Sequence, residues 1–475
     1  MVSVEITPQL DEQDHMPLYM QLYHYFKVEI QASRLSTSTR LPSIRQLAAD
    51  LNVSKTTVRM AYEQLLDEGY IESRERSGFF VEKMEEEVQQ IAEHMPAISC
   101  KREVDSKQPP ILFDFYMSSI DLNHFPFDSW RRYTNQYMHS NHKELLSYGD
   151  PQGEAGLRLE LCHYLRQSRG VNCSPEQIVL GSGTQTMIYM LCQLIGLDGS
   201  EIAMEEPGYQ NVRCVFEHLG FCIRPIPLEM DGMNIEELSK TGAKAVYITP
   251  SHQYPLGMVM PIAKRTRLLR WANENNAVII EDDYDGEFRY RGKPIPSLQG
   301  LDTNGTVVYV GTFSKSLLPA VRISYMVLPS RLLNEYQKRL SAYDQTVSRL
   351  HQQTLQTFME NGELERHVRK MRKIYKQKHH VLLQSIKMVM EDHVEVTGQD
   401  AGLHIVIKVN STLAADELVV IAQNAGVRVY STTDMWLNKP STYPPMILLG
   451  FGGLSLEEIQ EGIYHLHAAW QPYYQ

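Results

Sequence analysis

The spacing of hydrophobic and polar positions divides the chain into three stretches. Residues 1–82 show apolar residues at helical spacing first and short extended runs afterwards. Residues 83–110 are polar and charged and end in two prolines, which is typical of a linker. Residues 111–475 alternate short apolar runs with amphipathic segments. The pattern predicts a small N-terminal domain, a linker and a larger C-terminal domain.

The alternation in residues 111–475 is typical of an α/β domain in which helices cover both faces of a mostly parallel sheet. Strands are expected in QIVLGSG, EIAMEE, AVYITPS, AVIIEDDY and TVVYVGTFS, and helices in TQTMIYMLCQLIG and RTRLLRWANENN. The last hundred residues are helical and then α+β, with a closing helix that Ser455 caps. We therefore expect a smaller subdomain over about residues 340–475.

Three helices and a β-hairpin are expected in residues 1–82. The second helix follows its N-cap, Ser43, and the third begins at Ser54. Only Asn52-Val53 separate them, and two helices joined so tightly form a helix-turn-helix. The segment YIESRERSGFFVE then predicts two short strands around Arg76-Ser77-Gly78, which would form the wing of a winged helix-turn-helix.

The third predicted helix carries polar and basic side chains in its first turns, where a recognition helix enters the major groove of DNA. Hydroxyl groups and a helix N-terminus can bind phosphate oxygens, and a basic side chain can bind phosphate or a guanine edge. The residues expected to contact double-stranded operator DNA are Arg45, Ser54, Lys55, Thr56, Thr57, Arg59 and, in the wing, Gly78. The alternative is a helical module for protein contacts whose charges are solvated.

Composition narrows the class of protein without naming a function. The 475 residues are 43% hydrophobic and carry a net charge of −11, so any nucleic-acid surface has to be local. No run of 18 apolar residues predicts a membrane span, and the acidic N-terminus lacks the apolar core of a signal peptide. The six cysteines form no CxxC pair, which favours free thiols in a cytoplasmic protein and no metal site.

Four kinds of group in the C-terminal domain match the needs of pyridoxal 5'-phosphate. This cofactor needs a lysine for a Schiff base, a carboxylate for its pyridine nitrogen, a side chain stacked on its ring and groups that bind its phosphate. Lys315 follows a predicted strand in TFSKSLLPAVR. The hydroxyl groups of Thr312 and Ser314 and the guanidinium of Arg322 would form a phosphate site beside it.

The remaining candidates come from three other segments. Asp282 ends the buried strand AVIIEDDY and is expected to face the pyridine nitrogen, with Tyr284 at the 3-oxygen of the ring. The helix that opens in GSGTQ offers backbone amides to the phosphate at Gly183, Thr184 and Gln185, and Tyr209 can stack on the ring. Each signal alone has an ordinary explanation: a solvated lysine, a cap or metal carboxylate, a common turn, a core tyrosine. The set, in this order on an α/β scaffold, favours the cofactor.

The motifs also carry a family resemblance. RLPSIRQLAADLNVSKTTVRMAYEQLLDEGYIESRERSGFFV resembles the GntR family of winged-helix regulators, which more often carry Arg where Lys55 stands. SYGDPQG, GSGTQ, EEPGY, TPSHQYPLG, EDDYDGEF, TFSKSLLPAVR and AGLH resemble fold-type I aminotransferases. The whole chain looks like the MocR subfamily of GntR regulators, which includes members that respond to pyridoxal phosphate or to γ-aminobutyrate. The resemblance implies a homodimer, commonly domain-swapped, with cofactor sites at the subunit interface and Tyr148 reaching the partner's site.

Two departures from the aminotransferase pattern bear on function. Tyr254 stands where transaminases usually carry the Asn that bonds the 3-oxygen, so His252 or Gln253 is expected to compensate. The C-terminal stretch offers Asp434 where transaminases carry a carboxylate-binding arginine, with Arg428 a few residues earlier. Relatives responsive to γ-aminobutyrate also carry an arginine where this chain has Asn211, with Arg213 close by. We therefore expect an effector other than γ-aminobutyrate: another amino acid, a peptide-like amine or the cofactor itself.

Three functions remain open at this point. The favoured one is a transcription regulator that senses a small amine or amino acid by Schiff-base exchange at Lys315 and does not turn over substrate. The second is an active aminotransferase with an autoregulatory DNA-binding head. The third is a DNA-binding scaffold with an inert cofactor site. The complete candidate set around Lys315 argues against the third, and the two departures argue against the second.

Overall fold

A computed structural model describes residues 8, 10–11, 16–74, 77–83, 110–196, 199–290, 295–439 and 443–475. The chain forms two compact units, residues 1–106 and 107–475, which are described separately. Arg76, Cys100 and residues 84–109 of the expected linker lie outside the described residues.

The N-terminal unit is a winged helix-turn-helix. Its elements are α1 (Leu18–Gln31), α2 (Ile44–Asp50), α3 (Lys55–Asp67), β1 (Ile71–Arg74) and β2 (Gly78–Val81), and the two strands pair antiparallel. Ser43 and Ser54 cap α2 and α3, since their side chains accept hydrogen bonds from the backbone amides of Gln46 and Thr57. Apolar residues from all three helices form its core. The predicted helix-turn-helix and its two caps are confirmed.

An eight-stranded sheet forms the centre of the C-terminal unit. Its strand order is β4 (Ile178–Gly181), β11 (Ser324–Val327), β10 (Val307–Thr312), β9 (Val278–Asp283), β8 (Ala245–Ile248), β5 (Glu201–Glu206), β6 (Cys222–Glu229) and β7 (Gly232–Met233). The five strands from β10 to β6 are parallel, while β11 is antiparallel to both of its neighbours and β7 is antiparallel to β6. The mostly parallel sheet that the sequence predicts is confirmed.

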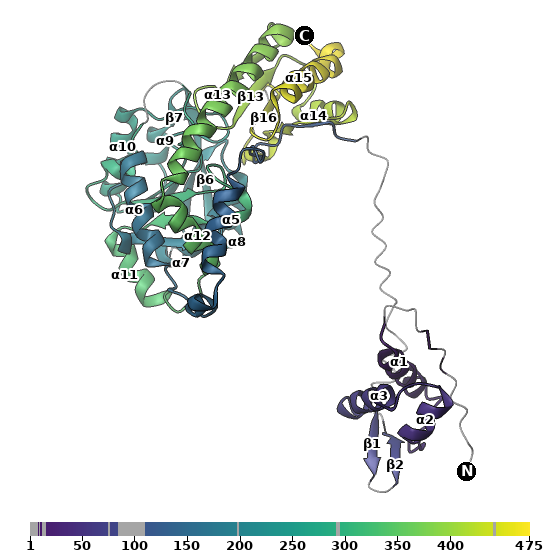
Figure 1. Cartoon of the computed structure of the whole chain (residues 1–475). Helices are drawn as coiled ribbons and strands as arrows, with labels where there is room; N and C mark the ends of the chain where they lie inside the picture. Colours follow the sequence, from purple (N-terminus) through teal and green to yellow (C-terminus); the bar gives the residue numbers. More distant parts are fainter. Residues whose placement is uncertain are drawn as a thin grey trace. The chain divides into compact units, whose positions relative to one another are not determined.

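Helices cover both faces of this sheet (Figure 1). Successive residues of a strand point to opposite faces, so Tyr309 packs against one helical layer and Val308 and Val310 against the other. The first layer contains α5 (Phe127–Tyr137), α6 (Ala155–Arg169), α9 (Ile235–Ser239), α10 (Ile262–Glu274) and α12 (Arg349–Glu360). The second contains α7 (Thr184–Ile195), α8 (Gln210–His218) and α11 (Ser330–Arg339). Because both faces of the sheet are buried, successive residues of a strand such as VVYV are all apolar.

The long helix α13 (Glu363–Met390) runs from this sheet to a smaller α+β subdomain (Figure 1). The subdomain has an antiparallel sheet of β12 (Val394–Thr397), β13 (His404–Val409), β16 (Met446–Gly450) and β15 (Tyr430–Ser431), with α14 (Ala415–Asn424) and α15 (Leu456–Trp470) packed on it. Ser455 caps α15 as predicted. The first strand of the unit, β3 (Phe113–Asp114), also pairs here, with β14 (Val427–Arg428), which the sequence pattern did not predict.

Candidate functional site

A cavity of about 550 Å³ lies at the carboxyl ends of the parallel strands β8, β9 and β10, beside the N-terminus of α7. Ligands of open α/β sheets bind at this edge. Ten residues that the sequence singled out line the cavity: Gly183, Thr184, Gln185, Tyr209, Asp282, Tyr284, Thr312, Ser314, Lys315 and Arg322. Four segments separated by many residues in the chain therefore meet at one place.

Lys315 follows β10 and is half-buried in the cavity wall. Burial lowers the pKa of Lys315 from 10.5 to about 8, and the negative charge of Asp285 opposes that shift. Its Nζ donates a hydrogen bond to the backbone carbonyl of Met117, a residue that no local pattern connects to it. The site therefore holds an amine that loses its proton far more easily than an exposed lysine does.

Asp282 is the penultimate residue of β9, lines the cavity and has one unpartnered oxygen. The hydroxyl of Tyr247, on the neighbouring strand β8, donates to its Oδ2 at 2.6 Å, while its Oδ1 is buried with no hydrogen-bond partner among the described residues. Burial raises the pKa of Asp282 to about 7, and the charges of Asp283 and Asp285 act in the same direction. A buried carboxylate oxygen of this kind needs a donor, so the geometry fits a cationic N–H group in the cavity.

Arg322 and the start of α7 form an anion-binding corner of the cavity. Gly183 caps α7 with φ 118° and ψ 159°, a conformation essentially restricted to glycine, and a Cβ there would lie 2.2 Å from Nη2 of Arg322. The same nitrogen donates to the carbonyl of Ser182 at 3.0 Å. Thr312 and Ser314 add hydroxyl groups 3.0 Å apart. Backbone amides, hydroxyls and a guanidinium together suit a phosphate.

Two aromatic rings face the cavity near Asp282. Tyr209 precedes α8, and its ring meets that of Tyr254 edge-on with centroids 5.1 Å apart. Both tyrosines line the cavity, and burial raises the pKa of both hydroxyls. A flat ring ligand could stack on either one.

His252 lies behind Tyr284 and does not line the cavity. Its Nδ1 lies 3.0 and 3.1 Å from the two carboxylate oxygens of Asp285 and 3.0 Å from the hydroxyl of Tyr284. In the tautomer that carries a hydrogen on Nδ1, His252 donates to the carboxylate of Asp285 and the Tyr284 oxygen can only accept from it. In that tautomer the proton of Tyr284 remains available to the cavity, which Tyr284 lines.

His404 completes this buried group. Its Nε2 lies 3.1 Å from the carbonyl of Pro255, and burial lowers the pKa of His404 to about 3, so its ring is neutral. His252, Asp285 and His404 bring nitrogen and oxygen atoms within 4.8 Å of one another, a spacing at which a metal could bind. The hydrogen bonds of His252 Nδ1 and His404 Nε2 account for part of this arrangement, while Nε2 of His252 is buried with no hydrogen-bond partner among the described residues.

The sequence missed a whole wall of the cavity. Residues 116–120 and Leu122, which follow β3 in the smaller subdomain, line the side near Lys315, and Tyr247, Thr249 and His404 line other parts. Tyr148 lies outside the cavity of its own chain, and its side chain is 87% exposed. The two arginines near the expected effector site do not line the cavity either. Arg213 donates to the carbonyl of Asp434, and Arg428 lies 3.4 Å from a carboxylate oxygen of Asp114.

The N-terminal unit presents a second candidate site at the start of α3. Lys55, Thr56 and Arg59 are exposed there, as is Arg45 on α2, and none of the three basic side chains has an ion-pair partner within the part of the chain that the structure describes. Ser54 and Thr57 are occupied with the cap, since their hydroxyl oxygens lie 2.8 Å apart. Gly78 begins β2 with φ 107°, beside the side chain of Arg40.

Family models and curated relatives agree with this division. The model described as "Aminotransferase class I and II" matches residues 115–439, and "Bacterial regulatory proteins, gntR family" matches residues 18–81. The probable rhizopine catabolism regulatory protein MocR of Rhizobium meliloti is 33% identical over 97% of this chain and 95% of its own length. The chain belongs to the MocR subfamily of GntR transcription regulators. Its DNA-binding unit is of the gntR type.

Other comparisons cover between 78% and 98% of this MocR-type regulator. An uncharacterized HTH-type transcriptional regulator of Bacillus subtilis (strain 168), YdeL, is 42% identical over 98% of this chain and 100% of its own length. The crystal structure of an archaeal alanine:glyoxylate aminotransferase superposes with a TM-score of 0.72 at 24% identity, covering 78% of this chain and 93% of that one, which shows the fold alone. The aminotransferase class I and II family depends on pyridoxal phosphate. Among the described residues, no helix has the length and apolarity to cross a membrane.

Proposed function

We propose that this MocR-type regulator binds pyridoxal 5'-phosphate at Lys315 and senses a small amine or amino acid by Schiff-base exchange there. One observation carries the proposal: an amine with a pKa of about 8 shares a cavity with the unpartnered buried oxygen of Asp282. Unlike other phosphorylated ligands, this cofactor needs an amine for a Schiff base and a carboxylate for its pyridine nitrogen, and these two groups match both needs.

The remaining cavity residues supply the other contacts that the cofactor needs. Arg322, the first amides of α7 and the hydroxyls of Thr312 and Ser314 would hold the phosphate. Tyr209 would lie against the ring, and the proton of Tyr284 would be donated to the 3-oxygen. His252 and Asp285 would act through Tyr284 as positioning residues, in the role that the usual asparagine has where Tyr254 stands here.

Exchange of the amine gives Lys315 two alternative partners. Pyridoxal phosphate supplies an aldehyde that holds either lysine or a free amine covalently and reversibly. A released Lys315 can donate to the carbonyl of Met117, the contact present in this structure. Met117 adjoins β16 closely, since the amide of Gly450 donates to Phe115 at 2.8 Å and a Cβ on Gly450 would lie 2.4 Å from Met117 Cα. The state of Lys315 is thereby coupled to the smaller subdomain, as a two-state sensor requires.

The charges around the cavity restrict the effector. Arg322 is the only arginine among the described residues that line it, and the phosphate of the cofactor would occupy its guanidinium. Neither Arg213 nor Arg428 faces the cavity. The proposed effector is therefore an amine whose binding does not depend on an arginine–carboxylate pair, and γ-aminobutyrate is disfavoured.

The deciding experiment loads the full-length protein with pyridoxal phosphate and adds primary amines and D- and L-amino acids in turn. We expect a rapid, saturable change in the visible absorption band with some of them, a parallel change in DNA affinity and no stoichiometric keto acid. Lys315→Ala should lose both responses. A fully responsive Lys315→Ala protein would overturn the proposal.

A second function, an aminotransferase with an autoregulatory DNA-binding head, has one observation in its favour. The aromatic-amino-acid aminotransferase 1 of Thermococcus litoralis is 29% identical over 290 residues, 59% of this chain. Sustained keto-acid formation with a keto-acid acceptor present would establish this second function in place of the sensor.

A further inference from the structure

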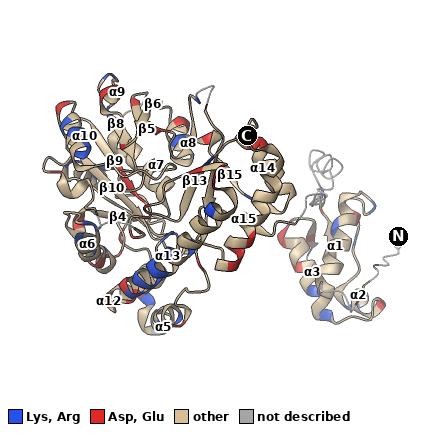
Figure 2. Cartoon of the chain, turned by 90° about the horizontal axis from the view of Figure 1, so that it is seen from above, with Lys and Arg blue, Asp and Glu red and all other residues tan. Residues whose placement is uncertain are grey.

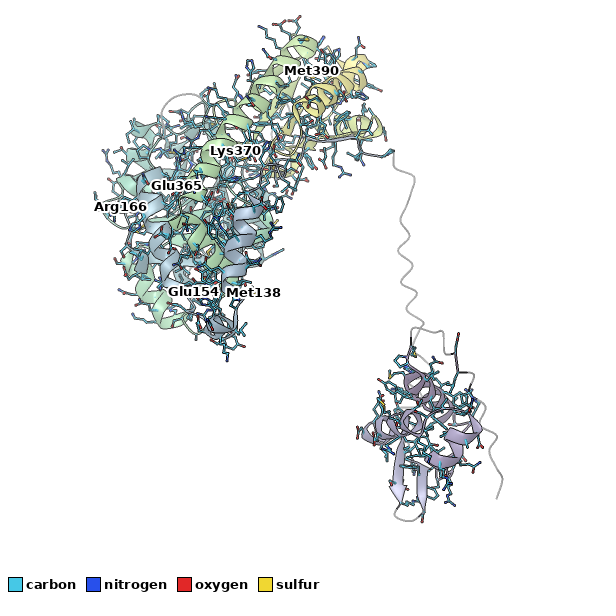
Figure 3. All side chains as sticks on the ribbon, in the orientation of Figure 1. Met138, Glu154, Arg166, Glu365, Lys370 and Met390 are labelled. Carbon is cyan, nitrogen blue, oxygen red and sulfur yellow. The ribbon has the colours of Figure 1, made fainter. Side chains whose placement is uncertain are left out.

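The long helix α13 carries an unusual concentration of positive charge. Residues 366–390 contain eight Lys and Arg and no Asp or Glu, in a chain whose net charge is −11. Figure 2 shows this charge as blue segments along α13, and Figure 3 marks Lys370 on the same helix. The charge is local, as an electrostatic binding surface on an acidic protein has to be.

Six of these side chains lie on one exposed face, which we call the α13 basic face: Arg366, Arg369, Lys370, Arg372, Lys373 and Lys376. At 100° per residue they span an arc of roughly 160°, and they extend about 15 Å along the helix axis. The opposite side of α13, including Met371, Tyr375 and Leu382, is buried in the core of the unit. The basic face is therefore held rigidly by a well-packed helix.

Most of the charge on this face is not neutralised by neighbours. Arg366 pairs with Glu363 at 3.0 Å, and Arg372 donates to the backbone carbonyl of Glu287. Lys370, Lys373 and Lys376 have no ion-pair partner within the described ranges of the chain. Three exposed lysines side by side repel one another, and a polyanion would relieve that repulsion.

The composition of the face favours a nucleic-acid backbone over a protein partner. Between residues 366 and 387 every exposed side chain is basic or is Gln or His, and none is a large apolar residue. Protein interfaces place aromatic and apolar residues at their centre and are depleted in Lys, whereas binding to phosphates needs only cations at a suitable spacing. The gntR-type unit of the same chain makes double-stranded DNA the polyanion that this chain is expected to bind.

We propose that the α13 basic face binds the phosphate backbone of the DNA that flanks the site held by the N-terminal unit. The contact is independent of base sequence and adds affinity through counterion release. It rests on DNA binding by the N-terminal unit and is independent of the cofactor. It would give the C-terminal unit a DNA contact of its own, on a helix that packs in the core of the smaller subdomain.

The test uses the full-length protein and a binding site that the protein itself selects from random DNA. One duplex covers that site alone, and a second extends it on both sides. We expect the extended duplex to bind roughly tenfold tighter at low salt, since a few extra phosphate contacts are made. The triple change Lys370→Glu, Lys373→Glu and Lys376→Glu should abolish that gain. It should also reduce the slope of log affinity against log salt by roughly one unit per lysine.

Two matched variants separate this contact from general charge repulsion. Changing the exposed residues Lys240, Lys244 and Lys338 to Glu alters the net charge equally away from α13 and should leave the gain intact. Arg at positions 370, 373 and 376 should retain it. The proposal would be overturned if the two triple Glu variants lost the same amount of affinity for the extended duplex. It would also be overturned if the wild-type protein bound both duplexes with equal affinity. A changed oligomeric mass with unchanged DNA binding would overturn it too and would assign the face to a protein contact.

Discussion

The surroundings of Lys315 in the cavity determine the pKa of its amine. Its amine can form a bond to an aldehyde only when neutral, and burial lowers its pKa from 10.5 to about 8. The neutral fraction is complete above that pKa and falls tenfold for each pH unit below it. We therefore expect the rate of pyridoxal phosphate uptake, followed by absorbance, to rise with pH to a half-maximum near pH 8.

A charge on a neighbouring residue provides the control for this prediction. Asp285 raises the pKa of Lys315, so Asp285→Asn should move the half-maximum to lower pH. Lys315→Ala should show no covalent uptake at any pH. A half-maximum near the ordinary lysine value, unmoved by Asp285→Asn, would mean that the amine is solvated.

Gly183 is the second residue whose environment makes a sharp prediction. A methyl group there would meet the guanidinium of Arg322 at 2.2 Å and displace it from the anion-binding corner. Gly183→Ala should therefore weaken pyridoxal phosphate binding at least tenfold, measured by equilibrium dialysis. It should also destabilise the fold by about 1–3 kcal/mol, because φ is 118°.

Gly220→Ala separates the two effects. Gly220 also has positive φ, at 80°, but has open space around its Cβ position and lies away from the cavity. The Gly220→Ala protein should be less stable than the wild type and should bind pyridoxal phosphate with unchanged affinity. Similar affinity losses in both variants would show that backbone strain, and not the position of Arg322, sets the binding.

The helix α3 is the element on which DNA affinity is expected to depend. Lys55 and Arg59 lie exposed in its first two turns without ion-pair partners in the described structure. Lys55→Ala and Arg59→Ala should each weaken operator binding and reduce the salt slope by roughly one unit where the side chain contacts phosphate. Arg34→Ala, which removes an exposed cation paired with Glu29 at 2.8 Å, should have little effect. Unchanged operator binding by both α3 variants would show that the DNA-recognition surface is not on this helix.

The helices and strands also show which features could be predicted from the sequence and which could not. The caps of α2 and α3 and the buried strands β9 and β10 were predictable because each depends on neighbouring residues or on a short apolar run. The wall formed by residues 116–120 was not, because Met117 meets Lys315 across 198 positions. The position of His252 behind Tyr284 depends on its pairing with Asp285, which no spacing in the chain reveals. Local chemistry therefore pointed to residues that line the cavity, and tertiary packing determined what supports them.

At the scale of the whole molecule, one predicted site residue, Tyr148, lies outside the cavity of its own chain. Tyr148 is 87% exposed, and Leu146 beside it is equally exposed. Single exposed apolar residues are ordinary, but Met138 and Phe127 are also more than 60% exposed in the same region of the sequence. These residues suit an interface between two copies, in which Tyr148 would complete the cofactor site of the partner.

Hybrid dimers test that arrangement directly. A Tyr148→Ala homodimer would lack the cross-subunit contact at both sites, and a Lys315→Ala homodimer would lack the amine at both. In a hybrid of the two, one site has the intact Lys315 of the first chain and the intact Tyr148 of the second, so the mixture should regain pyridoxal phosphate affinity at that site alone. Titration of differently tagged, co-purified hybrids should show one tight site per dimer. If Tyr148 instead acts within its own chain, both sites of the hybrid stay defective, and a monomeric mass in solution would remove the arrangement altogether.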